Sequence, residues 1–152
     1  MDLVVADASP LIGLDRAGAL HLLPGVFDRL AAPPAVVAEF GRRPPWLAEV
    51  AVANRAQVDV LMDLRFGPGE AEGLTVALER AGTSLLLDEK RARAFAKRHG
   101  LAIVGTAGVV LRAKGRGLIP AVRPVLDALK QSGFRLSDGL YAAVVAQAGE
   151  AD

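Results

Sequence analysis

Acidic residues follow the apolar runs in which this chain is expected to form strands. Asp7 comes directly after the apolar residues 3–6, and Asp88 comes directly after the apolar residues 85–87. Continuous apolar runs of this length are typical of strands buried on both faces. In an α/β sheet, ligands and reacting groups gather at the carboxyl ends of the parallel strands. We therefore expect Asp7 and Asp88 to face each other across one pocket, provided that their strands are neighbours.

Further carboxylates are placed where they could join this pair. Glu39 lies near the end of an expected helix that begins at Pro33-Pro34, and Glu70 lies in the first turn of another. Glu72 is a further candidate for the same cluster. Two bare carboxylates about 4 Å apart repel by about 4 kcal/mol at an effective dielectric constant near 20, so a cluster of four must take up protons or cations. Hard oxygen ligands without His or Cys favour Mg²⁺ or Mn²⁺. Such an ion can orient a phosphodiester and help generate hydroxide from bound water.

The elements that must position these acids alternate between short apolar strands and helices. Strands are expected at 3–6, 29–32, 57–61, 83–87 and 101–104. Helices are expected at 10–18, 19–23, 35–40, 46–52, 70–80, 89–98, 109–114, 119–130 and 140–147. This order predicts a three-layer α/β/α sandwich with a mostly parallel central sheet. The length of 152 residues predicts one domain over residues 1–152.

Composition narrows the class of protein. No uninterrupted apolar run approaches the ~20 residues that a membrane-spanning helix needs, and the start of the chain lacks the basic region of a signal peptide. We therefore expect a cytoplasmic protein that neither spans nor binds a membrane. Because the chain has no cysteine, it has no disulfide framework, thiol nucleophile or Cys-ligated zinc. Its high apolar content of 52% leads us to expect an oligomer, with a homodimer as the simplest form, although a well-filled monomer core would explain the same number.

Charge is unevenly distributed along the chain. The net charge is only +1, but residues 88–116 hold eight basic residues against two acids. Such a basic segment is usually the solvated face of a helix. Its position directly after Asp88 also suits contacts with phosphates, which require charge rather than the reading of a sequence. Arg91, Arg93 and Arg112 are the first candidates for such contacts.

The motifs that contain these acids resemble those of the PIN-domain family. They are Asp-Ala-Ser-Pro-Leu-Ile at 7–12, Pro-Ala-Val-Val-Ala-Glu at 34–39, Gly-Glu-Ala-Glu at 69–72 and Leu-Asp-Glu-Lys-Arg-Ala-Arg at 87–93. Gly-Thr at 105–106 and the segment 112–120 are similar to one prokaryotic branch of that family. The resemblance keeps the motif order over almost the whole chain. It implies an α/β/α sandwich and a Mg²⁺- or Mn²⁺-dependent ribonuclease, often the VapC-like toxin of a toxin–antitoxin pair, with RNA as substrate and an antitoxin as protein partner.

Carried over position by position, the resemblance implies that Asp7, Glu39, Glu70 and Asp88 are the catalytic and metal-binding residues. Glu70 stands where many VapC-like relatives have Asp. The Gly-Glu-Ala-Glu sequence is instead similar to that of flap-endonuclease relatives, in which both glutamates can bind the metal ions. The role of Glu72, and the choice between RNA and structured DNA, are therefore open from the sequence.

Two other classes of function fit the same residues. An aspartyl-phosphate phosphohydrolase would use Asp7 as its nucleophile, although Ser9 stands where such an enzyme usually has a second acid. A catalytically silent interaction domain would use the acids only to cap helices. Acidic residues in a first helical turn are stabilised by the helix dipole, and this alone would explain Glu70 and Glu72.

Overall fold

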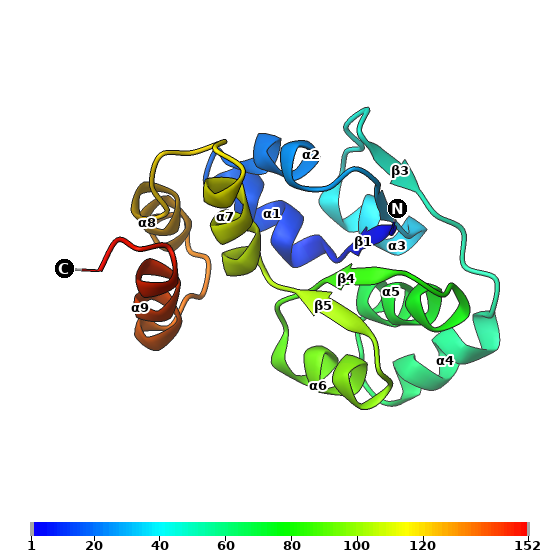
Figure 1. The fold of residues 1–152 in the computed structure, drawn as a ribbon. Helices are drawn as coiled ribbons and strands as arrows, with labels where there is room; N and C mark the ends of the chain where they lie inside the picture. Colours follow the sequence, from blue (N-terminus) through cyan, green and yellow to red (C-terminus); the bar gives the residue numbers. More distant parts are fainter. Residues whose placement is uncertain (1, 152) are drawn as a thin grey trace.

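The computed structural model describes residues 2–151 and shows a five-stranded parallel sheet between two layers of helices (Figure 1). The predicted α/β/α fold is therefore confirmed. The strands are β1 (Val4–Ala6), β2 (Leu30–Ala32), β3 (Leu47–Glu49), β4 (Ser84–Leu86) and β5 (Ala102–Val104). Their order across the sheet is β3-β2-β1-β4-β5.

Each face of the sheet buries its own apolar core. One core joins the sheet to α1 (Ala8–Arg16), the 3₁₀ helix η1 (Leu20–Leu22), α2 (Leu23–Val26), α7 (Thr106–Gly115), α8 (Arg123–Gln131) and α9 (Asp138–Gln147). The other joins it to α4 (Arg55–Asp63), α5 (Pro68–Glu79) and α6 (Lys90–Arg98). Alternation along β1 divides the two cores, because Val4 and Ala6 pack on the first side and Val5 on the second. The remaining helix, α3 (Pro34–Phe40), packs against both α1 and α5.

The order of the strands reverses between β1 and β4. From β1 the chain builds outward to β2 and β3, and it then returns to add β4 and β5 on the other side of β1. Ala6 pairs with Leu86, and the Asp7 N–H donates to the Leu86 carbonyl oxygen at 3.0 Å. Asp7 and Asp88 therefore follow neighbouring parallel strands at the same edge. A crevice at such a reversal is where open α/β sheets bind ligands.

Two predictions between residues 46 and 63 were wrong. The helix expected at 46–52 is the edge strand β3, which pairs in parallel with β2 and buries only Leu47 of its three residues. The edge strand expected at 57–61 is part of α4. The Asn54 side chain accepts a hydrogen bond from the Gln57 N–H at 3.0 Å and caps this helix. Val58 and Leu61, three residues apart, face the core, whereas Val60 is 52% exposed.

Other elements differ from prediction mainly at their ends. The first helix begins at Ala8 rather than Pro10, so Pro10 is its third residue, where a helix leaves the N–H unpaired in any case. The predicted helix 119–130 begins only at Arg123, and the helix predicted from Val109 begins at Thr106. Across residues 2–151, no helix combines the length and the apolar character needed to cross a membrane.

The helical register of α4 can be tested with two identical substitutions. Val58→Ala should lower the free energy of unfolding by about 2 kcal/mol, because it removes two fully buried methyl groups. Val60→Ala should change it by less than about 0.5 kcal/mol, because Val60 faces solvent. Urea denaturation measures both values. Equal losses would contradict the helix, since a strand would place the two valines on one face.

Candidate active site

Asp7 is the most perturbed carboxylate at the carboxyl edge of the sheet. It links β1 to α1 with an extended backbone, and its side chain is largely shielded from solvent. Burial, the largest cause, raises the pKa of Asp7 to about 7, although the Ala8 N–H acts in the opposite direction. The negative charges of Glu70, Glu39 and Asp88 raise it further. Asp7 therefore interacts electrostatically with each of the other three carboxylates predicted for the site.

Asp88 is held in place by the first residue of α7. Its Oδ1 accepts a hydrogen bond from the Thr106 N–H at 2.8 Å, and its Oδ2 accepts one from Thr106 Oγ1 at 2.5 Å. The Arg93 side chain lies alongside and donates to the Leu87 carbonyl oxygen at 2.9 Å. A Cβ added at Gly105 would lie 2.7 Å from Arg93 Nη1 and 3.0 Å from Asp88 Oδ1, so this arrangement requires glycine there. The orientation of Asp88 is thus fixed by hydrogen bonds within the protein.

Glu70 and Glu39 come from the first turn of α5 and the last turn of α3. Glu70 Oε1 accepts a hydrogen bond from the Gly67 N–H at 3.2 Å, just before α5 begins. Burial and the neighbouring Glu89 carboxylate nevertheless raise the pKa of Glu70. Glu39 is exposed and lines a cleft together with Asp88. The sheet edge therefore gathers the four acids from the residue after β1, from α3, from α5 and from the loop after β4.

Sequence reasoning missed Glu89 as part of this acidic group. Its side chain caps α6 by accepting hydrogen bonds from the Arg91 N–H at 3.1 Å and the Ala92 N–H at 2.6 Å. It lines the same cleft as Asp88 and Glu39. The only signal in the sequence was its position directly after Asp88, which suits a helix cap equally well.

Glu72 is directed away from this group. Its Oε1 accepts a hydrogen bond from the Ala35 N–H at 2.9 Å, and its Oε2 forms an ion pair with Arg55 Nη1 at 2.7 Å. The Glu72 side chain is only 8% exposed. Both of its oxygens are therefore engaged at the start of α3 and α4.

The donor atoms of the four predicted acids fit Mg²⁺ or Mn²⁺, because all of them are carboxylate oxygens. Asp7 supplies a buried carboxylate in the field of three other acids, where a cation would offset the unfavourable charge. Within residues 2–151, however, no three carboxylate or imidazole groups converge closely enough to hold a metal ion between them. The arrangement suits an ion that retains much of its water and takes one or two protein carboxylates.

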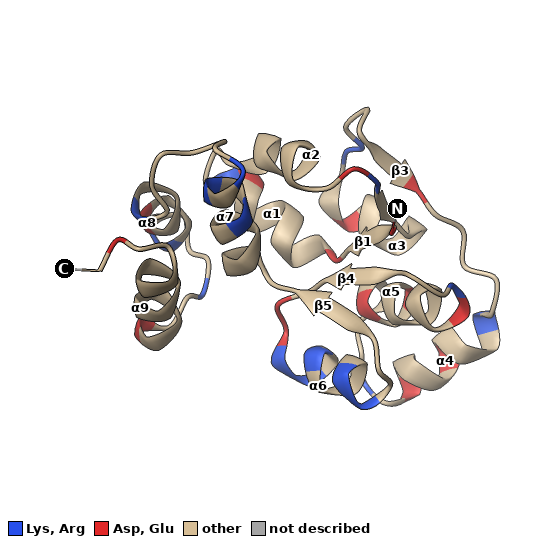
Figure 2. Cartoon of the chain, in the orientation of Figure 1, with Lys and Arg blue, Asp and Glu red and all other residues tan. Residues whose placement is uncertain are grey.

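Two clefts meet at Asp88 and Lys90. The smaller, of about 790 Å³, also includes Ser9, Arg16 and Glu39, and the larger, of about 1050 Å³, extends along α6 and α7. Both include Phe134 and Arg135, from the loop between α8 and α9. The basic residues that line one or both clefts are Arg16, Lys90, Arg93, Lys97, Arg112 and Arg135. Figure 2 shows the concentration of basic residues on α6 and α7.

Of the three arginines predicted to contact phosphate, two line the larger cleft. Arg93 and Arg112 lie there, on α6 and α7. The Arg91 guanidinium instead stacks 4.1 Å from the centre of the Phe66 ring and donates a hydrogen bond to the Leu64 carbonyl oxygen. Arg91 therefore joins α6 to the segment before α5 and is engaged within the protein.

A family model described as a PIN domain matches residues 3–150. No curated protein and no solved structure matches the chain.

The raised pKa of Asp7 predicts a pH-dependent effect of Asp7→Asn in protein kept free of metal by EDTA. Below pH 3.8, the pKa of Asp7 in the unfolded protein, Asp7 is protonated in both states and does not lower the free energy of unfolding. As the pH rises from 3.8 to the folded pKa of about 7, the unfolded state is increasingly favoured, because only there is Asp7 readily ionised. Asp7→Asn should therefore stabilise the protein at pH 8, by on the order of 2–4 kcal/mol, and have little effect near pH 4. Urea denaturation at both pH values measures this. The exposed Asp63 is the control, and an equal gain from Asp7→Asn at both pH values would contradict the prediction.

Proposed function

The chain belongs to the PIN-domain family, and from this premise we propose that it is a Mg²⁺- or Mn²⁺-dependent endoribonuclease that cleaves RNA phosphodiester bonds. Its fold is of the nuclease type. The position of Asp7 carries the proposal: a buried carboxylate at the reversal of strand order, in the field of Glu39, Glu70 and Asp88. Burying such a charge is costly unless a cation or a proton balances it.

In this proposal Asp7 and Asp88 would hold the ion, and Glu39 and Glu70 would add negative charge around it. A divalent ion bound there would supply the charge to orient a phosphate, to activate water and to stabilise a leaving oxygen. Thr106 keeps the Asp88 carboxylate oriented through two hydrogen bonds. The shielded position of Asp7 limits competition from bulk water for its oxygens.

The clefts on either side of Asp88 support a nucleic-acid substrate. Lys90 and Arg135 line both of them, and Arg93 and Lys97 extend the larger one. Lysine and arginine at these positions would contact phosphates and set the register of the strand without reading its bases. The engagement of Glu72 with Ala35 and Arg55 differs from the flap-endonuclease ligand set, and this favours RNA over structured DNA.

The proposal extends to a role as a VapC-like toxin, with an antitoxin as protein partner and the cytoplasm as the place of action. The resemblance of the motifs to that branch supports this role. A homodimer is part of the proposal, and the apolar content of 52% supports it. The family match over residues 3–150 supports treating residues 1–152 as one domain.

Two substitutions test the chemistry. Asp7→Asn and Asp88→Asn should each lower the cleavage of single-stranded RNA in Mn²⁺ or Mg²⁺ by at least about 100-fold, equivalent to about 2.7 kcal/mol of transition-state stabilisation. Both variants should retain the wild-type circular dichroism spectrum, because neither residue belongs to an apolar core. The measurement is the rate of cleavage of a labelled RNA.

The same assay separates the rival functions. Cleavage of small phosphomonoesters without action on RNA would indicate the aspartyl-phosphate phosphohydrolase. Failure to bind Mn²⁺ at millimolar concentration would indicate a silent interaction domain. Undiminished cleavage by Asp7→Asn would contradict the proposed site.

A separate prediction concerns the basic clefts. Arg135→Ala should raise the KM for single-stranded RNA and lower the slope of log KM against log salt concentration by about 0.7, the value for one lost phosphate contact on a single strand. Arg80→Ala should leave both quantities unchanged, because Arg80 ends α5 before β4 begins, at the opposite edge of the sheet. An equal effect of the two substitutions would show that the clefts do not carry the substrate.

A further inference from the structure

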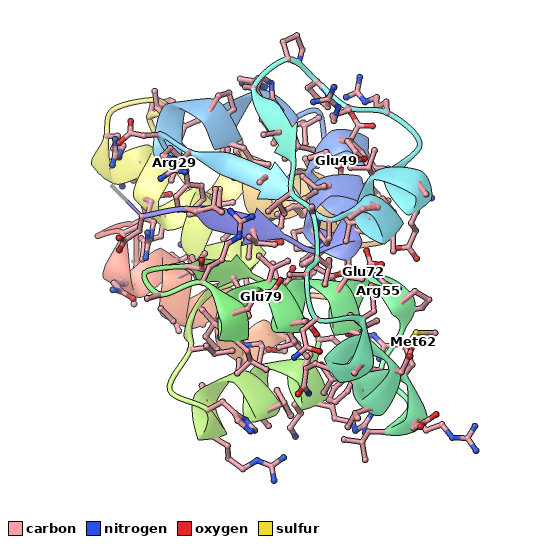
Figure 3. The ribbon with its side chains drawn as sticks, turned by 90° about the vertical axis from the view of Figure 1, so that its right-hand side faces the viewer. Arg29, Glu49, Arg55, Met62, Glu72 and Glu79 are labelled. Atoms are coloured by element: carbon pink, nitrogen blue, oxygen red, sulfur yellow. The ribbon has the colours of Figure 1, made fainter. Side chains whose placement is uncertain are left out.

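Glu72 is a buried acid that the proposed chemistry does not use. Its carboxylate accepts the Ala35 N–H with one oxygen and pairs with Arg55 through the other. Arg55 is 57% exposed, whereas Glu72 is almost enclosed. Figure 3 shows Glu72 and Arg55 together, with Glu79 farther along α5. The enclosed end of this ion pair therefore faces the first turn of α3.

Ala35 is the second residue of α3, and its N–H is one of those that a helix leaves without an internal partner. A carboxylate at this position supplies that partner and also stabilises the helix dipole. Because α3 has only seven residues, fixing its first turn also fixes the direction of its last turn, where Glu39 lies. The contact between Glu72 and Ala35 therefore adds to the packing that sets the position of Glu39.

The surface of α5 is shaped for close contact with α3. Gly69 lies one turn before Glu72, and a Cβ added there would be 3.0 Å from Val36 Cγ2 and 3.5 Å from Asp7 Oδ1. Gly69 thus lets α3 approach the first turn of α5 closely at Val36, with Asp7 in ordinary contact beside it. At the end of the same contact surface, Glu72 accepts a hydrogen bond from the Ala35 N–H of α3.

We propose that Glu72 is a positioning residue, which holds α3 on α5 so that Glu39 is presented to Asp7 and Asp88. This inference rests on the proposed nuclease function for its effect on catalysis. In this proposal α5 supplies two residues with different roles. Glu70 adds its carboxylate to the site, and Glu72 positions Glu39 through its hydrogen bond to the backbone of α3. Of the two roles that the sequence left open for Glu72, this proposal takes the indirect one.

Glu79 provides a matched control. It also lies on α5, and its two oxygens accept hydrogen bonds from the Ala53 N–H at 2.9 Å and the Asn54 N–H at 3.0 Å. These bonds hold the segment before α4, at the end of α5 far from Glu70. Weakening Glu79 should therefore cost stability as weakening Glu72 does, without moving α3.

The test compares Glu72→Asp, Glu72→Gln and Glu79→Asp. Aspartate is one carbon too short to reach Ala35, so Glu72→Asp should lower kcat for RNA by at least about tenfold, with KM changed less than about twofold, as expected when a catalytic group is displaced. Glu72→Gln should retain kcat within about threefold, because its amide oxygen still accepts the Ala35 N–H. Glu79→Asp should retain wild-type kcat and KM.

Hydrogen exchange provides a readout that does not depend on activity. The amides of α3 should exchange at least about tenfold faster in Glu72→Asp, and at the wild-type rate in Glu72→Gln and Glu79→Asp. Unchanged α3 exchange in Glu72→Asp would overturn the inference. So would a Glu72→Gln variant that loses activity together with Mn²⁺ affinity, because that result would make Glu72 a ligand. If the wild-type protein did not cleave RNA, the proposed function would fail, and the exchange data would still decide whether Glu72 anchors α3.

Discussion

Parallel pairing of β1 with β4 is the constraint on which the rest of the site depends. The hydrogen bond from the Asp7 N–H to the Leu86 carbonyl oxygen continues this pairing one residue past the strand. It brings two acids that are far apart in the sequence to adjacent positions. Because all five strands run in the same direction, the helices that follow them also begin at this edge. The sheet thus collects backbone N–H groups and carboxylates in one place.

This geometry explains why most of the acids at the edge are stable there. Asp88, Glu70, Glu72 and Glu89 each accept hydrogen bonds from backbone N–H groups at or near the start of a helix. Capping alone would account for those four residues. Asp7 is different, because burial and the surrounding negative charge outweigh its contact with the Ala8 N–H and raise its pKa to about 7. A residue that serves only as a cap would not be held at such a cost, so Asp7 requires an explanation beyond capping.

The sequence was informative where apolar runs were long and ended in an acid. The runs before Asp7 and Asp88 predicted the neighbouring strands correctly, because few structures other than buried parallel strands accommodate them. Between residues 46 and 63 the elements are short and only partly buried. Their periodicity fits a helix or a strand equally well, and pairing with β2 and packing on α5 decide between the two.

Helix geometry separates the directions of Glu70 and Glu72. Residues two apart on a helix point in widely different directions, so Glu70 and Glu72 could not both face one pocket once 68–79 was helical. What no local pattern contained was the partner of Glu72. The Ala35 N–H lies within reach of Glu72 because α3 packs closely on α5, where Gly69 leaves room for Val36. Long-range packing of this kind is invisible to periodicity.

The walls of the clefts are built separately from the acids. Phe134 and Arg135 come from the loop that joins α8 to α9, and this loop rests on α1 at Gly13, where an added Cβ would lie 2.6 Å from Phe134 Cδ2. The strands and the first turns of the helices fix the acids, whereas a loop near the end of the chain borders the space in front of them. Changes in that loop would therefore alter which strand of nucleic acid can enter while leaving Asp7 and Asp88 in place.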